Sequence, residues 1–409
     1  MKITILTQYF PPEVGAPQNR LFELAVRLKK KGADITIVTA MPNYPQMEIH
    51  EGFKRKFYSF ENIEGLKTHR CWIFVCKNKN IILRLLNYFS FVISSIIIGL
   101  LKLKKQDVLI VESPPLFLGI SGLLLAKAKK AKFVFNVSDL WPESAEKLEI
   151  ISNKFILHQT TKLEEFFYKK ADLITGQTQG ICKNISQRFP RKNVYWLKNG
   201  VDTNFYNLEK PINLSWRKEN GFNENDIIFI YAGIIGYAQG LDIILNVSKE
   251  FIEKSEIKFV FLGNGPEKDR LVKLKNKLNL TNVYFFDSEP KCKMQEILLS
   301  TNASIIPLKK IDLFKGAIPS KIFENLALKK PIILGVDGEA RKLFIDNGKC
   351  GLYFEPENEK ELCERIEFFI NNPQLMLEMG ENGYNYVKKE FNRETISNNL
   401  WEKLIELKL

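Results

Sequence analysis

The 409-residue sequence has few of the side chains that bind metals or form disulfides. It contains only three histidines, His50, His69 and His158, all in its first half. Its six cysteines form no Cys-x-x-Cys pair and no regular series, and no Asp-x-Asp pair follows an expected strand. These absences argue against a histidine-rich metal site, a zinc cluster and a disulfide framework, and they favour the reduced thiols of a cytoplasmic protein.

The sequence also lacks a complete dinucleotide fingerprint of the form Gly-x-Gly-x-x-Gly. Gly263-Asn264-Gly265-Pro266 begins like one, but Lys268 stands where the last glycine would be, which argues against NAD. The apolar run at residues 1–8 is too short for a signal peptide and favours a first strand. We therefore expect the protein to stay on the cytoplasmic side.

Charge is distributed unevenly along the chain. Residues 1–198 carry 31 Lys and Arg against 16 Asp and Glu, a net charge of +15, whereas residues 199–409 carry 29 against 31, a net charge of −2. Basic runs such as 102–105 and 127–132 accompany apolar helices, without a nucleic-acid-binding motif. We therefore expect an anionic membrane surface, and no nucleic acid, as a partner of the first half. Solvated helix ends are the alternative explanation.

The most hydrophobic segment, residues 81–101, carries no charge from residue 85 to residue 101. These 17 residues stand at the lower limit for crossing a bilayer, and they lie between two expected strands of one sheet. We therefore expect a helix that packs on the sheet and partly inserts into the membrane, so that the protein is peripheral on the inner face of the cell membrane.

Apolar runs that suit buried strands alternate with helical patterns along the whole chain. They lie at residues 3–7, 35–39, 66–75, 108–112, 133–137, 173–176, 194–197, 227–232, 259–262, 283–286, 303–307 and 332–336. Most are too uniformly apolar for a half-exposed sheet, which predicts an α/β fold with parallel strands covered on both faces. Because the chain exceeds the roughly 250–300 residues at which one core stops growing, and the pattern restarts after Asn199-Gly200, we expect two domains, 1–198 and 199–390.

The most informative stretch is residues 316–334, which predicts a loop, a short helix opening at Pro319 or Ser320, and a buried strand. Lys321 and the free backbone N–H groups of the first turn suit an anion such as phosphate. Glu324 lies three residues later on the same face and suits vicinal hydroxyl groups. Together they suit a sugar nucleotide; a helix cap with a surface ion pair is the alternative.

Other loops after strands carry small or acidic residues. The backbone can approach a phosphate at four small residues, which are Gly15, Ala16, Gly236 and Gly265. The run Ser138-Asp139-Leu140-Trp141-Pro142-Glu143-Ser144 follows the fifth strand and is unusually rich in acidic and aromatic residues. The alternative for this run is that Asp139 caps a helix and Trp141 packs in the core.

Together these motifs resemble glycosyltransferase family 4. The residues concerned are 9–20, 138–144, 199–202, 238–242 and Pro319-Ser320-Lys321-x-Phe323-Glu324, and within the family they look like the branch of bacterial O-antigen and capsule N-acetylfucosaminyl transferases. The resemblance covers nearly the whole chain. It implies a GT-B fold, in which two Rossmann-like domains face each other across a cleft, the first binding the acceptor and the second the nucleotide sugar. It also implies a C-terminal helix, within residues 391–409, that crosses back to the first domain.

The resemblance further implies a retaining transfer from a UDP-sugar, without a metal or other cofactor, to a saccharide linked to undecaprenyl diphosphate. By motif, Glu324 looks like the ribose ligand, Lys321 a diphosphate ligand, Gly15 part of the loop over the phosphate, and Asp139 a group beside the donor sugar. We therefore expect catalytic roles for Asp139 and Lys321. Expected donor contacts are Gly15, Ala16, Gly236, Gly265, Ser320, Lys321 and Glu324, and expected acceptor contacts are Glu13, Arg20 and Glu143.

Two departures from the family pattern affect the expected phosphate site. Gly316 stands where the E-x7-E motif that ends at Glu324 would begin, and residues 237–239 lack the usual basic pair, so Lys321 must supply most of the positive charge. A nucleotide-sugar 2-epimerase is the alternative enzyme, but it would need neither the apolar helix nor the basic half. A non-catalytic nucleic-acid or membrane-binding protein would leave Ser320, Lys321 and Glu324 without a role.

Overall fold

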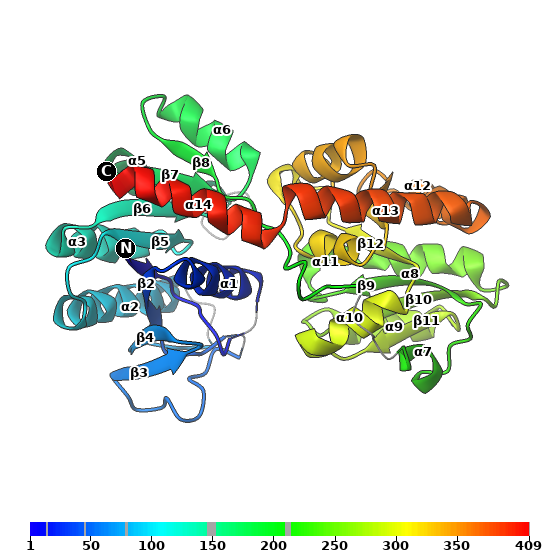
Figure 1. The fold of residues 1–409 in the computed structure, drawn as a ribbon. Coiled ribbons are helices and arrows are strands. Elements are labelled where there is room, and N and C mark those ends of the chain that lie inside the picture. The colour runs from blue at the N-terminus through cyan, green and yellow to red at the C-terminus, as the bar shows by residue number, and fades with distance from the viewer. Residues whose placement is uncertain (14, 45, 78–80, 145–152, 209–213, 409) are drawn as a thin grey trace. The chain divides into compact units, whose positions relative to one another are not determined.

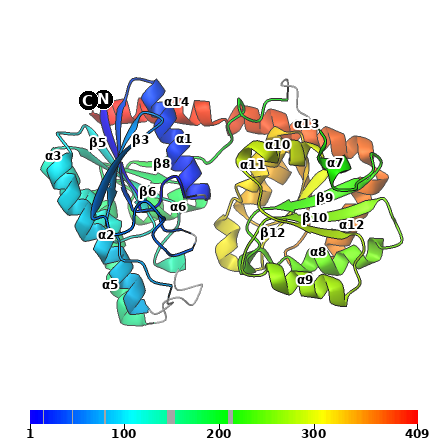
Figure 2. The same cartoon turned by 90° about the horizontal axis from the view of Figure 1, so that it is seen from below.

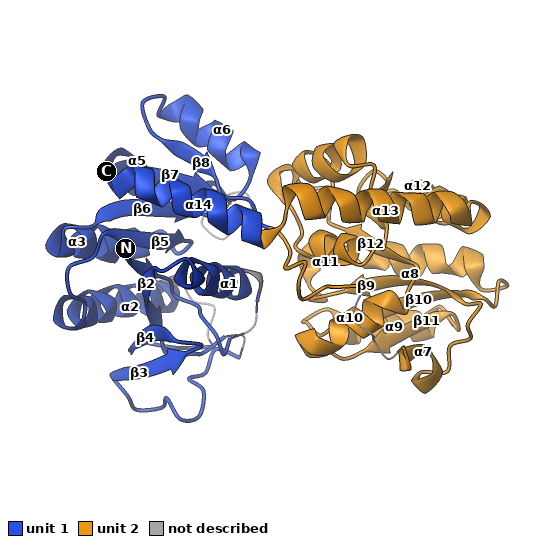
Figure 3. Cartoon of the chain, in the orientation of Figure 1, with its two compact units in different colours: residues 1–199, 394–409 blue, residues 200–393 orange. Residues whose placement is uncertain are grey.

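The computed structural model describes residues 1–13, 15–44, 46–77, 81–144, 153–208 and 214–408. They form two compact units, coloured separately in Figure 3: unit 1 comprises residues 1–199 and 394–409, and unit 2 comprises residues 200–393. The domain boundaries expected at 198/199 and 390/391 lie one and three residues before the observed boundaries at 199/200 and 393/394. Val201 pairs with Asn392 in a short parallel bridge, so the two ends of unit 2 are hydrogen-bonded to each other.

Unit 1 is built on an eight-stranded sheet whose strand order is β3-β4-β2-β1-β5-β6-β7-β8 (Figure 1). The strands are β1 (Lys2–Leu6), β2 (Asp34–Ala40), β3 (Tyr58–Ile63), β4 (Leu66–Cys71), β5 (Val108–Ser113), β6 (Lys132–Val137), β7 (Leu173–Gly176) and β8 (Val194–Trp196). The order reverses between β1 and β5, so the loops after these two strands flank the crevice in which such sheets bind ligands.

The first edge strand differs from the expected all-parallel sheet. β3 pairs antiparallel with β4, because Glu64 and Gly65 both adopt positive φ angles and turn the chain back. β3 is half-exposed and carries Ser59, Glu61 and Asn62, so it has no apolar run that would mark it as a strand. The strand expected at residues 66–75 also ends early, at Cys71.

Helices cover both faces of the first sheet. They are α1 (Ala16–Lys30), α2 (Ile81–Lys102), α3 (Leu118–Lys129), α5 (Lys154–Lys170), α6 (Gln179–Arg188) and α14 (Arg393–Lys408). α1 and α14 lie on one face and α2, α3 and α5 on the other (Figure 2). Leu400 and Leu404 of α14 pack in one core with Leu21 of α1 and Ile3 of β1. The last helix is therefore an integral part of unit 1.

Unit 2 contains a six-stranded sheet in the order β11-β10-β9-β12-β13-β14, and every pairing is parallel. The strands are β9 (Ile227–Ala232), β10 (Ile257–Leu262), β11 (Val283–Phe286), β12 (Ala303–Pro307), β13 (Ile332–Gly335) and β14 (Gly351–Tyr353). The three-residue β14 has no marked apolar run and is absent from the strands expected from the sequence. This order is that of a Rossmann sheet, with its topological switch point between β9 and β12.

The helices of unit 2 also form a layer on each face (Figure 2). They are α7 (Trp216–Glu219), α8 (Asp242–Ser248), α9 (Lys268–Lys277), α10 (Lys291–Leu299), α11 (Lys321–Ala327), α12 (Glu359–Asn371) and α13 (Pro373–Glu390), with short turns η1 (Tyr237–Gln239), η2 (Lys249–Phe251), η3 (Asp312–Gly316) and η4 (Arg341–Asn347). α8, α9 and α12 pack on one face of the sheet, and α10, α11 and α13 on the other. In each unit the ligand site is therefore expected at the loops that follow the carboxyl ends of the strands.

Candidate functional site

At the switch point of unit 2, the glycine-rich loop after β9, residues 233–240, is held against the loop after β10. The N–H of Ile235 donates to the carbonyl of Asn264 (3.0 Å), and the N–H of Glu267 donates to the carbonyl of Ile235 (3.1 Å). A Cβ atom at Gly265 would collide with the Ile235 carbonyl oxygen, so only glycine fits there. The sequence predicts that the backbone at Gly236 and at Gly265 can approach a phosphate, and the structure places the two glycines in this pair of bonded loops.

Lys321 lies beside the same loop. It is the first residue of α11, and its Nζ atom is 3.7 Å from the ring centroid of Tyr231 and 3.1 Å from where a Cβ atom would stand at Gly233. Burial lowers the pKa of Lys321 to about 7, although the negative charge of Glu324 works in the opposite direction. Close to neutral pH the side-chain amine of Lys321 is therefore only partly protonated. A bound anion would raise the pKa of this amine and so make it fully protonated.

α11 is shorter than the three turns expected from the sequence. It has seven residues, because the backbone leaves the helical path at Leu328 and Lys329 takes a left-handed conformation before the chain enters β13. Ser320 is its N-cap residue but makes no side-chain capping hydrogen bond, and Glu324 is half-buried one turn later. In so short a helix, the positive charge at this site comes mainly from the Lys321 side chain.

In unit 1, Arg20 of α1 reaches the carboxyl ends of β5 and β6. One Nη atom donates to Glu112 (2.6 Å) and to Ser138 (2.7 Å), and Arg20 and Glu112 are 7% and 4% exposed. Ser138 also donates to Glu112. A buried ion pair of this kind is costly to break, so it fixes the start of the loop that carries Asp139. Arg20 is thus bonded to the start of this loop, and the acceptor contact expected of it stays a prediction.

Asp139 is half-buried directly after this network. Burial raises the pKa of its carboxyl, the neighbouring Glu143 raises it further, and hydrogen bonds from Ser144 and from the Leu140 backbone oppose the shift. Trp141 packs edge-on against Phe117, with 5.8 Å between the ring centroids. It therefore contributes to the core, as the alternative explanation of this run predicts. Asp139 itself bonds to Ser144, five residues later.

Glu143 lies in a different part of unit 1, beside α5 and α6. It lines a pocket together with residues of α5 and α6, among them Glu164 and Arg188, which pair at 3.1 Å. Residues 145–152, which follow it, lie outside the described part of the chain. The acceptor contact expected of Glu143 therefore stays a prediction.

The loop between β1 and α1 is fixed by Glu13. Its buried carboxylate accepts from the backbone N–H groups of Phe10 (3.1 Å), Asn43 (2.8 Å) and Tyr44 (2.8 Å), while burial raises its pKa. Glu13 thus links the loops that follow β1 and β2 at the carboxyl ends of these strands. Gly15 is the N-cap of α1 and has no side chain to cap it, and Ala16 is the first helical residue, although its side chain lies outside the described structure.

The expected site residues thus fall into two groups, one in each unit. Unit 1 holds Glu13, Gly15, Ala16, Arg20, Asp139 and Glu143, and unit 2 holds Gly236, Gly265, Ser320, Lys321 and Glu324. In the part of the chain that the structure describes, no three His, Cys, Asp or Glu side chains are grouped to hold a metal ion. Sequence reasoning missed Glu112, Tyr231 and Lys309, of which Lys309 had one available signal: it stands two residues after a strand end.

Comparison with known proteins agrees with this architecture. Residues 18–205 match the model of the family described as Glycosyltransferase Family 4, and residues 213–386 match that described as Glycosyl transferases group 1. The putative colanic acid biosynthesis glycosyl transferase WcaI of Escherichia coli is 25% identical over 408 residues, which cover 97% of this chain and 96% of that protein.

Solved structures share the fold at low sequence identity. Sucrose-phosphate synthase from Thermosynechococcus elongatus has a TM-score of 0.77 at 14% identity, covering 99% of this chain and 98% of that one. Anabaena HepE in complex with UDP and glucose has a TM-score of 0.72 at 15% identity, covering 99% and 100%. Each of the two Rossmann-like units is matched by one family model over most of its length. These matches identify the chain as a GT-B glycosyltransferase that belongs to glycosyltransferase family 4.

Proposed function

We propose that the protein is a retaining glycosyltransferase of capsule or O-antigen synthesis. It transfers a sugar such as N-acetylfucosamine from a UDP-sugar donor to a saccharide linked to undecaprenyl diphosphate. The observation that carries the proposal is the Lys321 ammonium beside the glycine loop after β9, with Glu324 one turn further along α11. The similarity to a protein named for colanic acid biosynthesis, and to HepE, which binds UDP and glucose, supports it.

In the proposed reaction, the bond between the anomeric carbon and the β-phosphate oxygen breaks, and its electron pair leaves with UDP. The acceptor hydroxyl oxygen bonds to the anomeric carbon on the same face, and its proton passes to the departing phosphate oxygen. Negative charge grows on the diphosphate as the bond breaks, so a fixed ammonium at Lys321 stabilises the transition state more than the bound substrate. We assign Asp139 a role beside the donor sugar, either orienting the sugar or stabilising the positive charge that develops on it.

Replacing Glu324 by alanine is expected to weaken UDP binding by roughly ten- to a hundredfold. Loss of a hydrogen bond to a charged group costs about 1.5–3 kcal/mol, and Glu324 is the carboxylate proposed to hold the ribose hydroxyls. Calorimetry with UDP measures the effect. Glu364→Ala, which removes an exposed carboxylate of α12, is the matched control and should bind UDP like the native protein. Unchanged affinity in a folded Glu324→Ala protein would refute the assignment.

Activity is expected to survive EDTA, because the sequence offers neither a histidine cluster nor an Asp-x-Asp pair after an expected strand. Sugar transfer from the UDP-sugar would be measured before and after treatment with EDTA, and again after manganese or magnesium is returned. Complete loss of transfer that either metal restores would mean that the diphosphate is held through a metal ion and that Lys321 is not the principal cation.

A membrane location is part of the proposal, and α2 supplies its support. Among the described residues, one helix, Ile82–Lys102, is long and apolar enough to span a membrane, but several of its uncharged polar side chains bond within unit 1. Asn87 accepts from Gln8 (3.1 Å), Ser95 bonds to Ser121 of α3 (2.8 Å), and Ser94 donates to the Trp72 carbonyl (2.5 Å). A helix bonded in this way to the sheet and to α3 is held in the domain and does not cross the bilayer.

The outer face of α2 is apolar instead of polar. Its exposed large side chains recur at helical spacing and are Ile82, Leu86, Phe89, Ile93, Ile97, Leu100 and Leu101. Exposed basic residues, Arg84, Lys102, Lys104 and Lys105, flank this stripe. A contiguous exposed apolar surface with a basic rim suits partial insertion into an anionic membrane, where a lipid-linked acceptor would be within reach.

A further inference from the structure

We propose that Lys309 is a second cation of the donor diphosphate site and replaces the basic residues that the loop after β9 lacks. This inference rests on the proposed use of a nucleoside diphosphate sugar. Lys309 stands two residues after the end of β12, and β12 is the neighbour of β9 at the topological switch point of unit 2. The loops after these two strands flank the crevice in which a sheet of this order binds its ligand.

Lys309 is attached to the glycine loop by its backbone. Its N–H donates to the carbonyl of Ala238 (2.9 Å), and a Cβ atom at Gly240 would stand 3.2 Å from its Cγ atom. The two lysines thus meet opposite ends of one loop, since Lys321 lies at Gly233 and Lys309 at Gly240. No residue of the loop, 233–240, carries a charge. A diphosphate on this loop would therefore depend on these lysines for its counter-charge.

The Lys309 ammonium lies over an exposed aromatic ring. Its Nζ atom is 3.1 Å from the ring centroid of Tyr237, which is 69% exposed. A cation–π contact at an exposed site is worth only about 0.5–1 kcal/mol, whereas a hydrogen bond between charged groups is worth about 1.5–3 kcal/mol. The ring therefore holds the ammonium near the loop without preventing its transfer to a phosphate.

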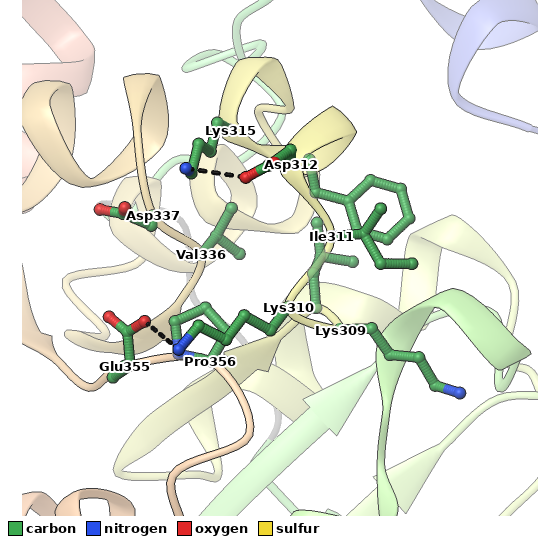
Figure 4. A pocket seen from close by; sticks show the side chains of 11 residues that line it. Lys309, Lys310, Ile311, Asp312, Lys315, Val336, Asp337, Glu355 and Pro356 are labelled. Atoms are coloured by element: carbon green, nitrogen blue, oxygen red, sulfur yellow. Dashed lines mark ion pairs between the residues drawn. The ribbon is translucent and has the colours of Figure 1, made fainter. Parts of the chain in front are cut away.

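Neighbouring lysines differ from Lys309 in having acidic partners. Lys310 pairs with Glu355 (3.0 Å) and Lys315 with Asp312 (2.8 Å), and in Figure 4 the Lys309 side chain points away from both pairs. Among the described residues, no carboxylate lies within ion-pairing distance of Lys309. Lys321 supplies only part of this charge in the free protein near neutral pH, because burial lowers its pKa to about 7.

The test compares UDP with uridine, which lacks the phosphates, by calorimetry on the full chain. Lys309→Met is expected to weaken UDP binding by about ten- to a hundredfold while leaving uridine binding within about twofold. Lys309→Arg, which keeps the charge, should retain most of the affinity for UDP. Lys310→Met, which removes the adjacent lysine and its exposed ion pair, is the matched control and should bind both compounds like the native protein.

Each other outcome has a definite meaning. If the native protein prefers UDP to uridine and Lys309→Met keeps that preference, Lys309 is not a phosphate ligand, whereas the proposed function stands. If Lys309→Met weakens the binding of uridine as much as that of UDP, the role of Lys309 is to shape the loop. That result would also overturn the inference. A native protein that binds UDP no better than uridine would contradict both the inference and the proposed function.

Discussion

Replacing Lys321 by alanine is expected to lower kcat by two to three orders of magnitude. Removal of one preorganised electrostatic group typically costs about 3–4 kcal/mol of transition-state stabilisation, and Lys321 is the cation enclosed at the glycine loop. Binding of UDP should fall less than turnover, because the diphosphate gains charge only as the glycosidic bond breaks. Steady-state kinetics with the donor varied measures both. A change confined to KM would make Lys321 a binding residue only.

The pH dependence gives an independent test of the same residue. In the free protein the pKa of Lys321 is lowered to about 7, and the protonated form below this pKa is the one that binds the diphosphate. kcat/KM for the donor should therefore fall by about tenfold per pH unit above pH 7, whereas kcat should stay level to higher pH, because the bound anion retains the proton. Lys321→Ala should lose this break, whereas Lys277→Ala, an exposed lysine of α9, should keep it.

Substituting Ile93 and Ile97 together by aspartate is expected to reduce vesicle binding by on the order of a hundredfold or more. Each large apolar side chain moved out of water contributes about 1.5–3 kcal/mol, and the two new charges add repulsion from anionic lipid. The fold should persist, because both side chains are exposed on unit 1. Flotation with anionic and neutral vesicles measures the binding, and Leu377→Asp, an exposed leucine of α13, is the matched control.

Three membrane outcomes are distinguishable. Partial insertion predicts that anionic vesicles bind better than neutral ones and that high salt or carbonate releases much of the protein. A spanning helix predicts release only by detergent, and a purely structural α2 predicts no vesicle binding by the native chain. Transfer to a water-soluble acceptor analogue should be unaffected by the two substitutions, which separates lipid binding from catalysis. Indifference to lipid charge would remove the electrostatic part of the proposal.

Much of the fold could be read from the sequence because parallel strands buried on both faces leave uniformly apolar runs. Such runs predicted twelve of the strands that unit 1 and unit 2 contain. β3 was missed because it is polar and half-exposed, and β14 because Gly351–Tyr353 has no marked apolar run. The apolar segment predicted at residues 81–101 also agrees with α2, Ile81–Lys102, because hydropathy depends on composition alone.

Contacts between distant residues were decided only by the tertiary structure. Arg20 and Glu112 are 92 residues apart, and nothing in their local sequence indicates a buried pair. The exposed apolar stripe on α2 could be located only once the structure showed which face of the helix the sheet and α3 cover. The helix is apolar nearly all round, and uncharged polar side chains such as Asn87 and Ser95 face inward. Lys309 likewise became a candidate only when the strand order placed β12 beside β9. Local sequence determines which segments become strands and helices, whereas the pairing of strands decides which of their ends meet, because a ligand site in a parallel sheet is formed by loops from separate parts of the chain.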